Sequence, residues 1–293
     1  AVPFARLPDP NVPVALHPKG RTDEARLGEA LRKLLEEDPS LKIERQEETG
    51  ELLLWGHGEL HLTTAKERPQ DYGVEVEFSV PKVPYRETIK KVAEGQGKYK
   101  KQTGGHGQYG DVWLRLEPAS EYGFEWRITG GVIPSKYQEA IEEGIKEAAK
   151  KGVLAGFPVM GFKAIVYNGS YHEVDSSDLA FQIAASLAFK VMAEAHPVLL
   201  EPIYRLKVLV PQERVGDVLS DLQARRGRIL GMEQEGALSV VHAEVPLAEV
   251  LEYYKALPGL TGGAGAYTLE FSHYAEVPPH LAQRIVQERA QEG

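Results

Sequence analysis

The sequence of 293 residues contains no cysteine. It therefore cannot build a disulfide framework or a metal site with thiolate ligands, and this absence favours an intracellular protein. The sequence also has no apolar run close to the roughly 20 residues that a membrane-spanning helix needs. From these two absences we expect a cytoplasmic protein that does not contact a membrane.

Nucleotide-binding motifs are absent as well. "TGGHGQYG" and "TGGAGAY" are rich in glycine, but neither fits G-x-x-x-x-G-K-[ST] or the dinucleotide fingerprint. We therefore expect no cofactor in this chain, and we do not expect the chain alone to bind or hydrolyse a nucleoside triphosphate.

Positive charge is scarce, since 34 Lys and Arg stand against 43 Asp and Glu and give a net charge of −9. This excess of acid argues against a protein that coats nucleic acid through its overall charge. Residues 85–118 differ, because they contain seven Lys and Arg and only four Asp and Glu. They include "KYKKQTGGHGQYG", which is either a solvated charged face or a local contact with nucleic acid.

Proline gathers at the start of the chain, where it occupies four of the first thirteen positions, and the first residue is not methionine. Proline-rich composition is typical of a linker between domains. We therefore expect a fragment or a processed chain whose residues 1–9 come from such a linker.

Two regions share one order of predicted elements. In residues 12–80 the hydrophobic pattern predicts the order β-α-β-β-α-β, with Thr22 as N-cap of a first helix that buries Leu27 and Leu31. The region from "IYRLKVLVP" to "AYTLEFSHYAEVP" repeats that order. Both regions are therefore predicted to adopt the split-βαβ, ferredoxin-like plan.

The region between them, about 85–199, has a different pattern of strands followed by a helix, a further strand and a second helix. The second helix, from Ser176 to about Ala193, is apolar nearly all round. We expect it to be buried between a sheet and another element, with Asp175 or Ser176 as its N-cap.

Two segments of this middle region, "TGGHGQYG" and "NGSYHEVDSS", are rich in glycine and small polar residues. If they lie at the same end of the domain they form one tip, and loops on a stiff scaffold are where function concentrates. The spacing of His172, Glu173, Asp175 and Asp178 fits neither H-E-x-x-H nor an EF-hand loop. No G-x-S-x-G elbow accompanies the neighbouring serines. We therefore expect neither a metal site nor a catalytic residue.

Contact with RNA is the chemistry that these residues favour. Lys98, Lys100 and Lys101 alternate with aromatic side chains and glycines, which suits phosphate contact and stacking on bases. "LQARRGRIL" adds Arg225 and Arg226 at a predicted helix end. For these two arginines the alternative is that they complement the helix dipole.

Several long motifs resemble the C-terminal half of bacterial elongation factor G, and the resemblance runs from about residue 9 to 280. The motifs are "EEDPSLKIERQEETGELLLWGHGELHL", "YRETI", "KQTGGHGQYGDV", "GSYHEVDSSDLAF", "PVLLEPIYRLKVLVPQERVGDVLSDLQARRGRILGME" and "HYAEVP".

The resemblance implies a multidomain α+β protein in which two ferredoxin-like domains flank a projecting arm. Residues 10–83 resemble domain III, residues 84–200 resemble the arm of domain IV (ribosomal protein S5 domain 2-like), residues 201–280 resemble domain V, and residues 281–293 form a helical tail. The family's GTPase domain, with its GTP and Mg²⁺, would lie in an N-terminal part outside this chain.

The resemblance also implies the partners and the site. In the family the tip of the arm enters the decoding site of the ribosome and contacts tRNA and mRNA during GTP-dependent translocation, and the protein is a monomer. The implied tip residues are Gly104, Gly105, His106, Gln108, Tyr109, His172, Glu173 and Asp175. The implied contacts with ribosomal RNA are Lys98, Lys100, Lys101, Arg225 and Arg226.

Some positions differ from the family pattern. His106 stands where the family usually has Arg, Asp111 where it often has His, and His57 where Met is usual, while Pro69 breaks a segment that is a regular helix in the family. These differences are typical of a divergent paralogue. Two alternatives stay open, namely a paralogue that acts in ribosome recycling and a stand-alone ribosome-binding regulator without a GTPase domain.

Overall fold

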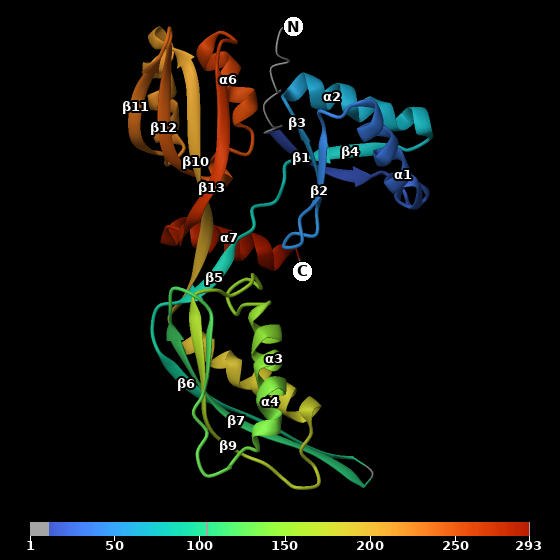
Figure 1. Cartoon of the computed structure of the whole chain (residues 1–293), viewed down its shortest axis with the longest axis vertical. Coiled ribbons are helices and arrows are strands. Elements are labelled where there is room, and N and C mark those ends of the chain that lie inside the picture. Colours follow the sequence, from blue (N-terminus) through green and yellow to red (C-terminus); the bar gives the residue numbers. More distant parts are fainter. Residues whose placement is uncertain (1–11, 104, 293) are drawn as a thin grey trace, which may run out of the picture. The chain divides into compact units, whose positions relative to one another are not determined.

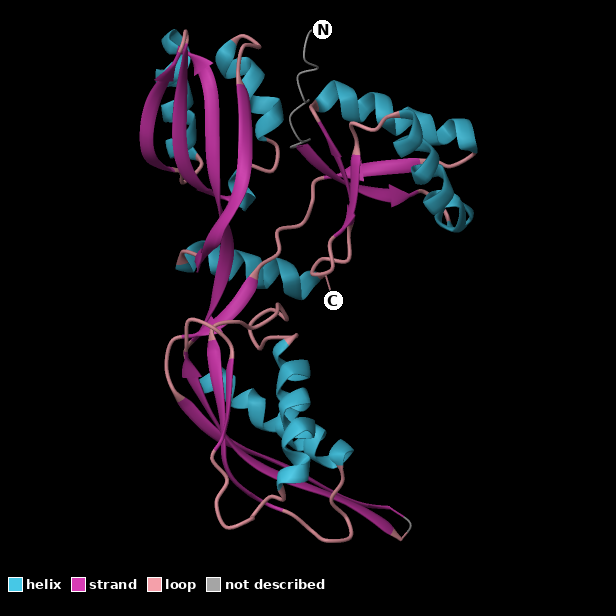
Figure 2. Ribbon diagram, in the orientation of Figure 1, coloured by secondary structure: helices cyan, strands magenta, loops and turns pink. Residues whose placement is uncertain are grey.

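The structure is a computed structural model that describes residues 12–103 and 105–292. It divides into two compact units, one made of the residues up to 84 with 202–274, the other of 85–201 with the residues from 275 onward. Each unit contains both sheets and helices (Figures 1 and 2), so the predicted mixed α+β multidomain class is confirmed.

The first ferredoxin-like part has a four-stranded sheet of order β2-β3-β1-β4. Its elements are β1 (Val12–Pro18), α1 (Arg21–Glu37), β2 (Lys42–Arg45), β3 (Leu52–Gly56), α2 (Glu59–Glu67) and β4 (Val76–Ser79). β1 pairs antiparallel with β3 and with β4, as the predicted β-α-β-β-α-β plan requires. After α2 the chain continues in a 3₁₀ turn, η1 (Arg68–Tyr72), because Pro69 cannot continue the α-helical hydrogen bonds.

The stripe of leucines on α1 faces the core of this part, where Leu27, Leu31 and Leu34 are buried. The predicted N-cap was wrong, because Gly20 holds that position without a side-chain hydrogen bond and Thr22 lies inside the helix. The carbonyl of Gly20 accepts from the N–H of Glu24 at 3.0 Å, which starts the helical ladder before Thr22.

The second ferredoxin-like part has the strand order β11-β12-β10-β13. Its elements are β10 (Pro197–Pro211), a 3₁₀ turn η4 (Gln212–Arg214), α5 (Val215–Ala224), β11 (Arg228–Glu235), β12 (Leu238–Pro246), a 3₁₀ turn η5 (Leu247–Glu249), α6 (Tyr253–Thr261) and β13 (Ala266–Glu276). The helix α6 begins later than predicted. Val250, just before it, is buried in the core and has a non-helical φ of −125°.

The arm is built on a four-stranded sheet of order β6-β7-β9-β8. Its strands are β6 (Ala93–Thr103), β7 (His106–Pro118), β8 (Gly123–Trp126) and β9 (Phe162–Ser170), and β8 runs parallel to β9. The helical elements are η2 (Ser135–Tyr137), α3 (Gln138–Ala149), α4 (Asp178–Phe189) and η3 (Lys190–Glu194). Figure 1 shows α3 and α4 side by side at the sheet, and buried side chains of both helices share one core with β7 and β9.

α4 lies unusually close to the β6–β7 hairpin. A Cβ atom at Gly97 would overlap the carbonyl oxygen of Ala184, and one at Gly110 would lie 2.5 Å from the carbonyl oxygen of Ala180. Glycines on the strands and alanines on the helix therefore allow the backbone of α4 to approach the backbone of the hairpin. The predicted helix thus lies along the hairpin. The helix is not buried all round, however, because Leu179 is 56% exposed.

The N-cap of α4 also differs from the prediction. Ser177, rather than Asp175 or Ser176, caps the helix, and its Oγ accepts from the N–H of Ala180 at 3.1 Å. The hydroxyl of Ser176 is already engaged, since it accepts from the N–H of His172 and donates to the carbonyl of Tyr109. The next serine therefore serves as the cap.

Two more elements complete the second unit. β5 (Arg86–Ile89) pairs antiparallel with the start of β10, from Pro197 to Leu200. The last helix, α7 (Pro279–Gln291), contacts the loop after α3 through Arg289, whose guanidinium lies 4.7 Å from the ring centre of Phe157. Over the described ranges, no helix has the length and apolar character needed to cross a membrane.

Candidate nucleic-acid interface

The two polar segments of the arm meet at the far end of the β6–β7 hairpin (Figure 1). The N–H of Tyr109 donates to the carbonyl of Asp175 at 3.0 Å, and the Oγ of Ser176 donates to the carbonyl of Tyr109 at 2.9 Å. A β-bridge joins Tyr109 to Ser176. The prediction that both segments form one tip is therefore confirmed for the described residues, while Gly104 lies outside them.

Gly107 sets how tightly the segments pack. A Cβ atom there would lie 2.6 Å from Oδ2 of Asp175, so a larger residue would displace this carboxylate. Gly105 has a φ of +97°, a conformation that favours glycine in the hairpin turn. His106 beside it is exposed, and Gln108 is half-buried opposite Lys101.

The segment from His172 to Ser176 forms a compact turn. The N–H of Ser176 donates to the carbonyl of His172 at 3.0 Å, and the N–H of His172 donates to Ser176 Oγ at 2.9 Å. Inside this turn the Nδ1 of His172 accepts from the N–H groups of Val174 and Asp175, at 3.2 and 3.1 Å. The imidazole is thus fixed by the backbone while its side chain remains 55% exposed.

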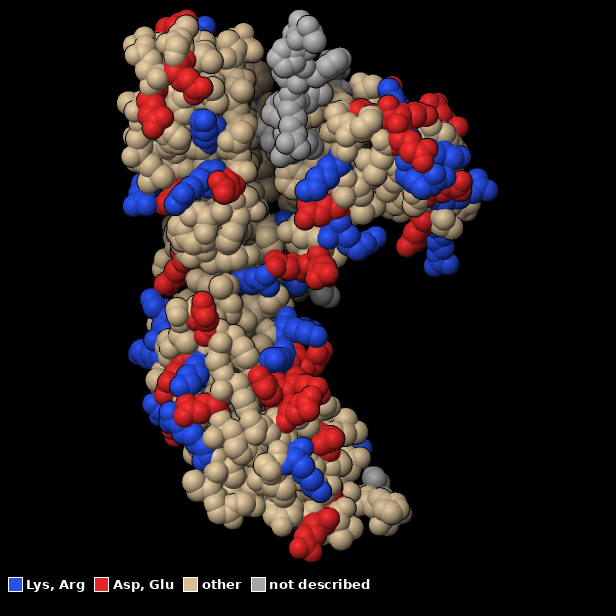
Figure 3. Space-filling view, viewed as in Figure 1, with Lys and Arg blue, Asp and Glu red and all other residues tan. Residues whose placement is uncertain are grey.

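The outer surface of the turn is open. Val174 is 80% exposed and Glu173 is also exposed, so a large apolar side chain and an acid project next to His172. In the view of Figure 3, charged side chains of both signs lie over the body of the arm and its end is mostly uncharged. Within the described part of the chain, no group of three or more His, Cys, Asp or Glu is arranged to hold a metal ion.

A polar network lies on the sheet behind the tip. Asp111 is 6% exposed and accepts from Gln96 Nε2 at 2.7 Å and from Ser170 Oγ at 2.6 Å. The hydroxyl of Tyr109 lies 2.6 Å from Ser170 Oγ, and Lys98 Nζ lies 5.6 Å from the centre of the Tyr109 ring. These contacts position Tyr109. Sequence reasoning did not find Gln96 and Ser170, because strand register brings them next to Asp111.

The predicted lysines divide between the two faces of β6. Lys98 and Lys100 share one face, Lys101 lies on the other, and all three are exposed. Their ammonium groups therefore lie beside the hairpin on both sides. This placement suits contact with phosphates on either side of the hairpin.

Arg225 and Arg226 are held inside the second ferredoxin-like part. Arg225 donates to Asp221 Oδ2 at 2.8 Å and to the carbonyl of Glu249 at 2.7 Å, and it lies over the ring of Tyr253. Arg226, with a φ of +57°, donates to Glu249 Oε1 at 3.1 Å. Both arginines therefore organise the end of α5, and they lie in a different unit from the tip.

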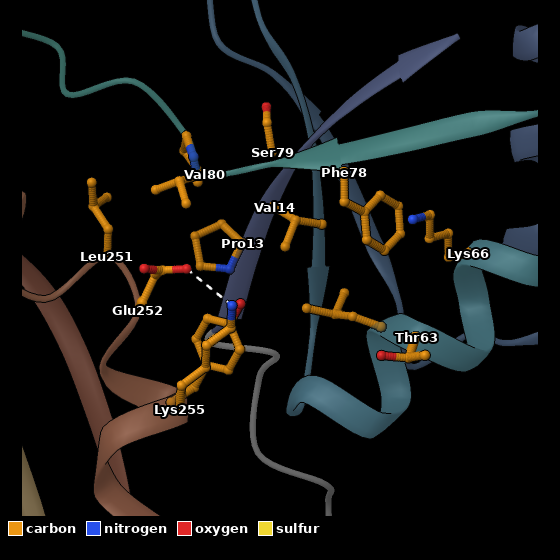
Figure 4. Close-up of a pocket in the computed structure, with 13 residues that line it drawn as sticks. Pro13, Val14, Thr63, Lys66, Phe78, Ser79, Val80, Leu251, Glu252 and Lys255 are labelled. Carbon is orange, nitrogen blue, oxygen red and sulfur yellow. Dashed lines mark hydrogen bonds and ion pairs between the residues drawn. The ribbon is translucent and has the colours of Figure 1, made fainter. Parts of the chain in front are cut away.

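A separate cavity of about 270 Å³ lies in the first unit (Figure 4). Pro13, Val14 and Phe78 line one side, and Leu251 lines the other. Glu252 and Lys255 form an ion pair of 3.0 Å at its edge. The sequence carried no motif for this cavity, because its lining residues come from separated segments of the chain.

The comparison with protein families identifies the family of the whole chain. Residues 7–80 match the model for elongation factor G domain III, residues 81–195 match that for elongation factor G domain IV, and residues 198–285 match that for the elongation factor G C-terminus. The chain belongs to the elongation factor G family. The resemblance identified from the sequence is thus confirmed, and the arm described above is domain IV of this family.

A solved structure supports the same assignment. A crystal structure of a protein from Thermus thermophilus is 98% identical to this elongation factor G-family chain, with a TM-score of 0.93. The match covers 100% of this chain and 44% of that chain. This chain therefore spans less than half the length of the protein that it matches.

Proposed function

We propose that this chain is the ribosome-binding part of an elongation factor G-like translational GTPase, and that it promotes GTP-dependent translocation of tRNA and mRNA. The observation that carries the proposal is the tip, where two segments converge and fix the exposed His172 on a hydrogen-bonded turn. A fixed imidazole at the end of a packed arm suits contact with structured RNA, which proteins recognise largely by shape and by polar groups of the backbone and bases.

In this proposal the chain acts mechanically. GTP and Mg²⁺ are bound by a GTPase domain outside the chain, and the arm holds the paired tRNA and mRNA in the decoding site of a cytoplasmic ribosome. The tip residues contact tRNA and mRNA, and Lys98, Lys100, Lys101, Arg225 and Arg226 contact ribosomal RNA. The protein acts as a monomer.

The test is His172→Ala in the protein that carries this chain together with its GTPase domain. We expect translocation to slow by about tenfold or more. Loss of one hydrogen bond between His172 and the RNA, made while tRNA and mRNA move, changes the rate by about that factor. Ribosome-stimulated GTP hydrolysis should remain close to that of the unchanged protein, because His172 would touch only the RNA. His280→Ala, at an exposed histidine of α7, is the matched control. Equal loss of translocation and hydrolysis would show that the tip has been assigned the wrong role.

A further inference from the structure

The hydrogen bonds of His172 determine where its ring carries a proton. Two backbone N–H groups, of Val174 and Asp175, point at Nδ1 from 3.2 and 3.1 Å. A nitrogen that accepts a hydrogen bond carries no proton, and a neutral imidazole has one donor and one acceptor nitrogen. The proton therefore sits on Nε2, the nitrogen that the turn leaves unengaged by these bonds.

We propose that His172 binds its RNA partner as a neutral hydrogen-bond donor through Nε2–H, and that the turn from His172 to Ser176 is the device that fixes this tautomer. The inference rests on the proposed function, in which the arm tip contacts tRNA and mRNA. Val174 and Asp175 are then positioning residues, since they act on the RNA only through the ring of His172.

The contacts around the ring fix the tautomer by their geometry. The carboxylate of Asp175 is the charged group nearest to Nδ1, with Oδ2 at 3.6 Å, which is too long for a hydrogen bond. The ring of Tyr109 lies 6.4 Å away, centre to centre. A proton on Nδ1 would point at the two backbone N–H groups and would break both of their bonds, without gaining a hydrogen bond to Asp175 in return.

The neutral donor predicts a particular kind of contact. Phosphate oxygens, ribose hydroxyls and base edges all accept hydrogen bonds, and a single directed N–H reads the position of such an acceptor. A cation would instead add a salt-dependent attraction to any nearby phosphate. The contact proposed here therefore depends on the shape of the RNA and changes little with salt.

The tautomer is measurable without a ribosome. In the 293-residue chain labelled with ¹⁵N-histidine, long-range proton–nitrogen correlations distinguish Nε2–H, Nδ1–H and imidazolium forms, and loss of one signal set in His172→Gln assigns His172. We expect the Nε2–H form near neutral pH. A dominant Nδ1–H or imidazolium form would overturn the inference.

Three substitutions test the function of the donor. Gln keeps a neutral N–H donor close to the position of Nε2, Arg supplies charged N–H donors on a longer side chain, and Ala supplies no donor. In the translocation assay we expect His172→Gln to stay within about threefold of the unchanged protein, and His172→Arg and His172→Ala to be slower by about tenfold or more.

The outcomes separate the inference from the function on which it rests. If His172→Ala translocates as fast as the unchanged protein, the tip does not have the proposed function. If His172→Ala is slow and His172→Arg restores the rate while His172→Gln does not, the tip has that function and the neutral donor is wrong.

Discussion

Glu87 on β5 is a fully buried carboxylate that accepts three hydrogen bonds from backbone N–H groups. The donors are Leu154 at 2.7 Å, Ala155 at 3.1 Å and Phe157 at 2.9 Å, all in the loop after α3. Hydrogen bonds to an ionised acceptor are stronger than neutral ones, so one side chain holds the whole loop against β5. The same loop receives Arg289 of α7, which donates to the carbonyl of Ala155.

Glu87→Gln should therefore destabilise the packing of the loop after α3 against β5 by about 2 kcal/mol or more. The amide nitrogen of Gln is a donor, and it would face at least one backbone N–H without an acceptor between them. Urea unfolding followed by circular dichroism measures the loss, and amide exchange at Leu154 and Phe157 shows whether it is local. Glu121→Gln, at an exposed glutamate of the same unit, is the control and should change little. Unchanged exchange at the loop amides in Glu87→Gln would contradict this account.

Glu125 on β8 makes the folding stability of the arm depend on pH. Hydrogen bonds from Arg127, at 2.6 Å, and from Lys163, at 2.8 Å, lower the pKa of this carboxyl from 4.5 to about 2. Because the folded-state pKa lies below the usual value, these bonds stabilise the arm fully above about pH 4.5, and the contribution disappears as the pH falls toward 2.

Glu125→Gln removes the titrating group. We expect its unfolding temperature to lie below that of the unchanged chain at neutral pH, and the two temperatures to converge as the pH falls through the pKa of about 2. Thermal unfolding at a series of pH values checks this. Added salt should narrow the gap at neutral pH, since the pair is partly exposed and is screened. A difference in unfolding temperature that stays constant down to the lowest pH would contradict the role given to the Glu125 carboxylate.

At the scale of elements, α4 lies close to the backbone of both strands of the β6–β7 hairpin. Gly97 and Gly110 face the backbone of α4 around Ala180 and Ala184, and no side chain separates the two. This approach lets α4 lie along the hairpin and bring the turn at its N-terminus against Tyr109. The tip geometry thus depends on residues that carry no chemistry of their own.

Gly97→Ala should destabilise the arm by about 3 kcal/mol, since the added methyl group overlaps the carbonyl of Ala184 and α4 has to shift. Gly28→Ala is a matched control, because Gly28 lies on the exposed face of α1 with nothing within 4 Å of an added Cβ. Alanine there should stabilise the chain by about 0.5–1 kcal/mol through its helix propensity. Urea unfolding of both variants measures the contrast, and a Gly97→Ala variant as stable as the unchanged chain would mean that α4 packs elsewhere.

The order of elements was predictable because it depends on hydrophobic periodicity and on breakers such as Pro69, which are local in sequence. The two N-caps were not predictable, because capping is a competition that distant contacts decide. Ser177 rather than Ser176 caps α4, because the hydroxyl of Ser176 already bonds to the backbones of Tyr109 and His172. The Gln96–Asp111–Ser170 network was missed for the same reason, since strand register brings its members together.

At the scale of the molecule, charge is distributed unevenly. The sequence has a net charge of −9, yet Lys98, Lys100 and Lys101 are exposed on both faces of one strand near the tip. The sequence predicted this local excess, but it could not show that Arg225 and Arg226 are engaged with Asp221 and Glu249. Exposed lysines are therefore the stronger candidates for phosphate contact.

Replacing Lys98, Lys100 and Lys101 together by Gln tests this at the level of the whole chain. Each lysine that neutralises a phosphate releases counterions, so it contributes about 0.7–0.9 to the slope of log affinity against log salt concentration. We expect the triple variant to bind ribosomes with a slope smaller by about 2–3. The affinity of the 293-residue chain for ribosomes at several salt concentrations measures it.

Lys146, Lys150 and Lys190, around the groove between α3 and α4, provide a control of equal charge, and their replacement by Gln should leave the slope unchanged. Equal slopes for the two triple variants would mean that only net charge matters and that the β6 lysines have no specific contact. Arg225→Ala with Arg226→Ala is the informative third case. An unchanged slope, together with a lower unfolding midpoint, would show that these arginines only organise the end of α5, whereas a smaller slope would show that they also bind RNA.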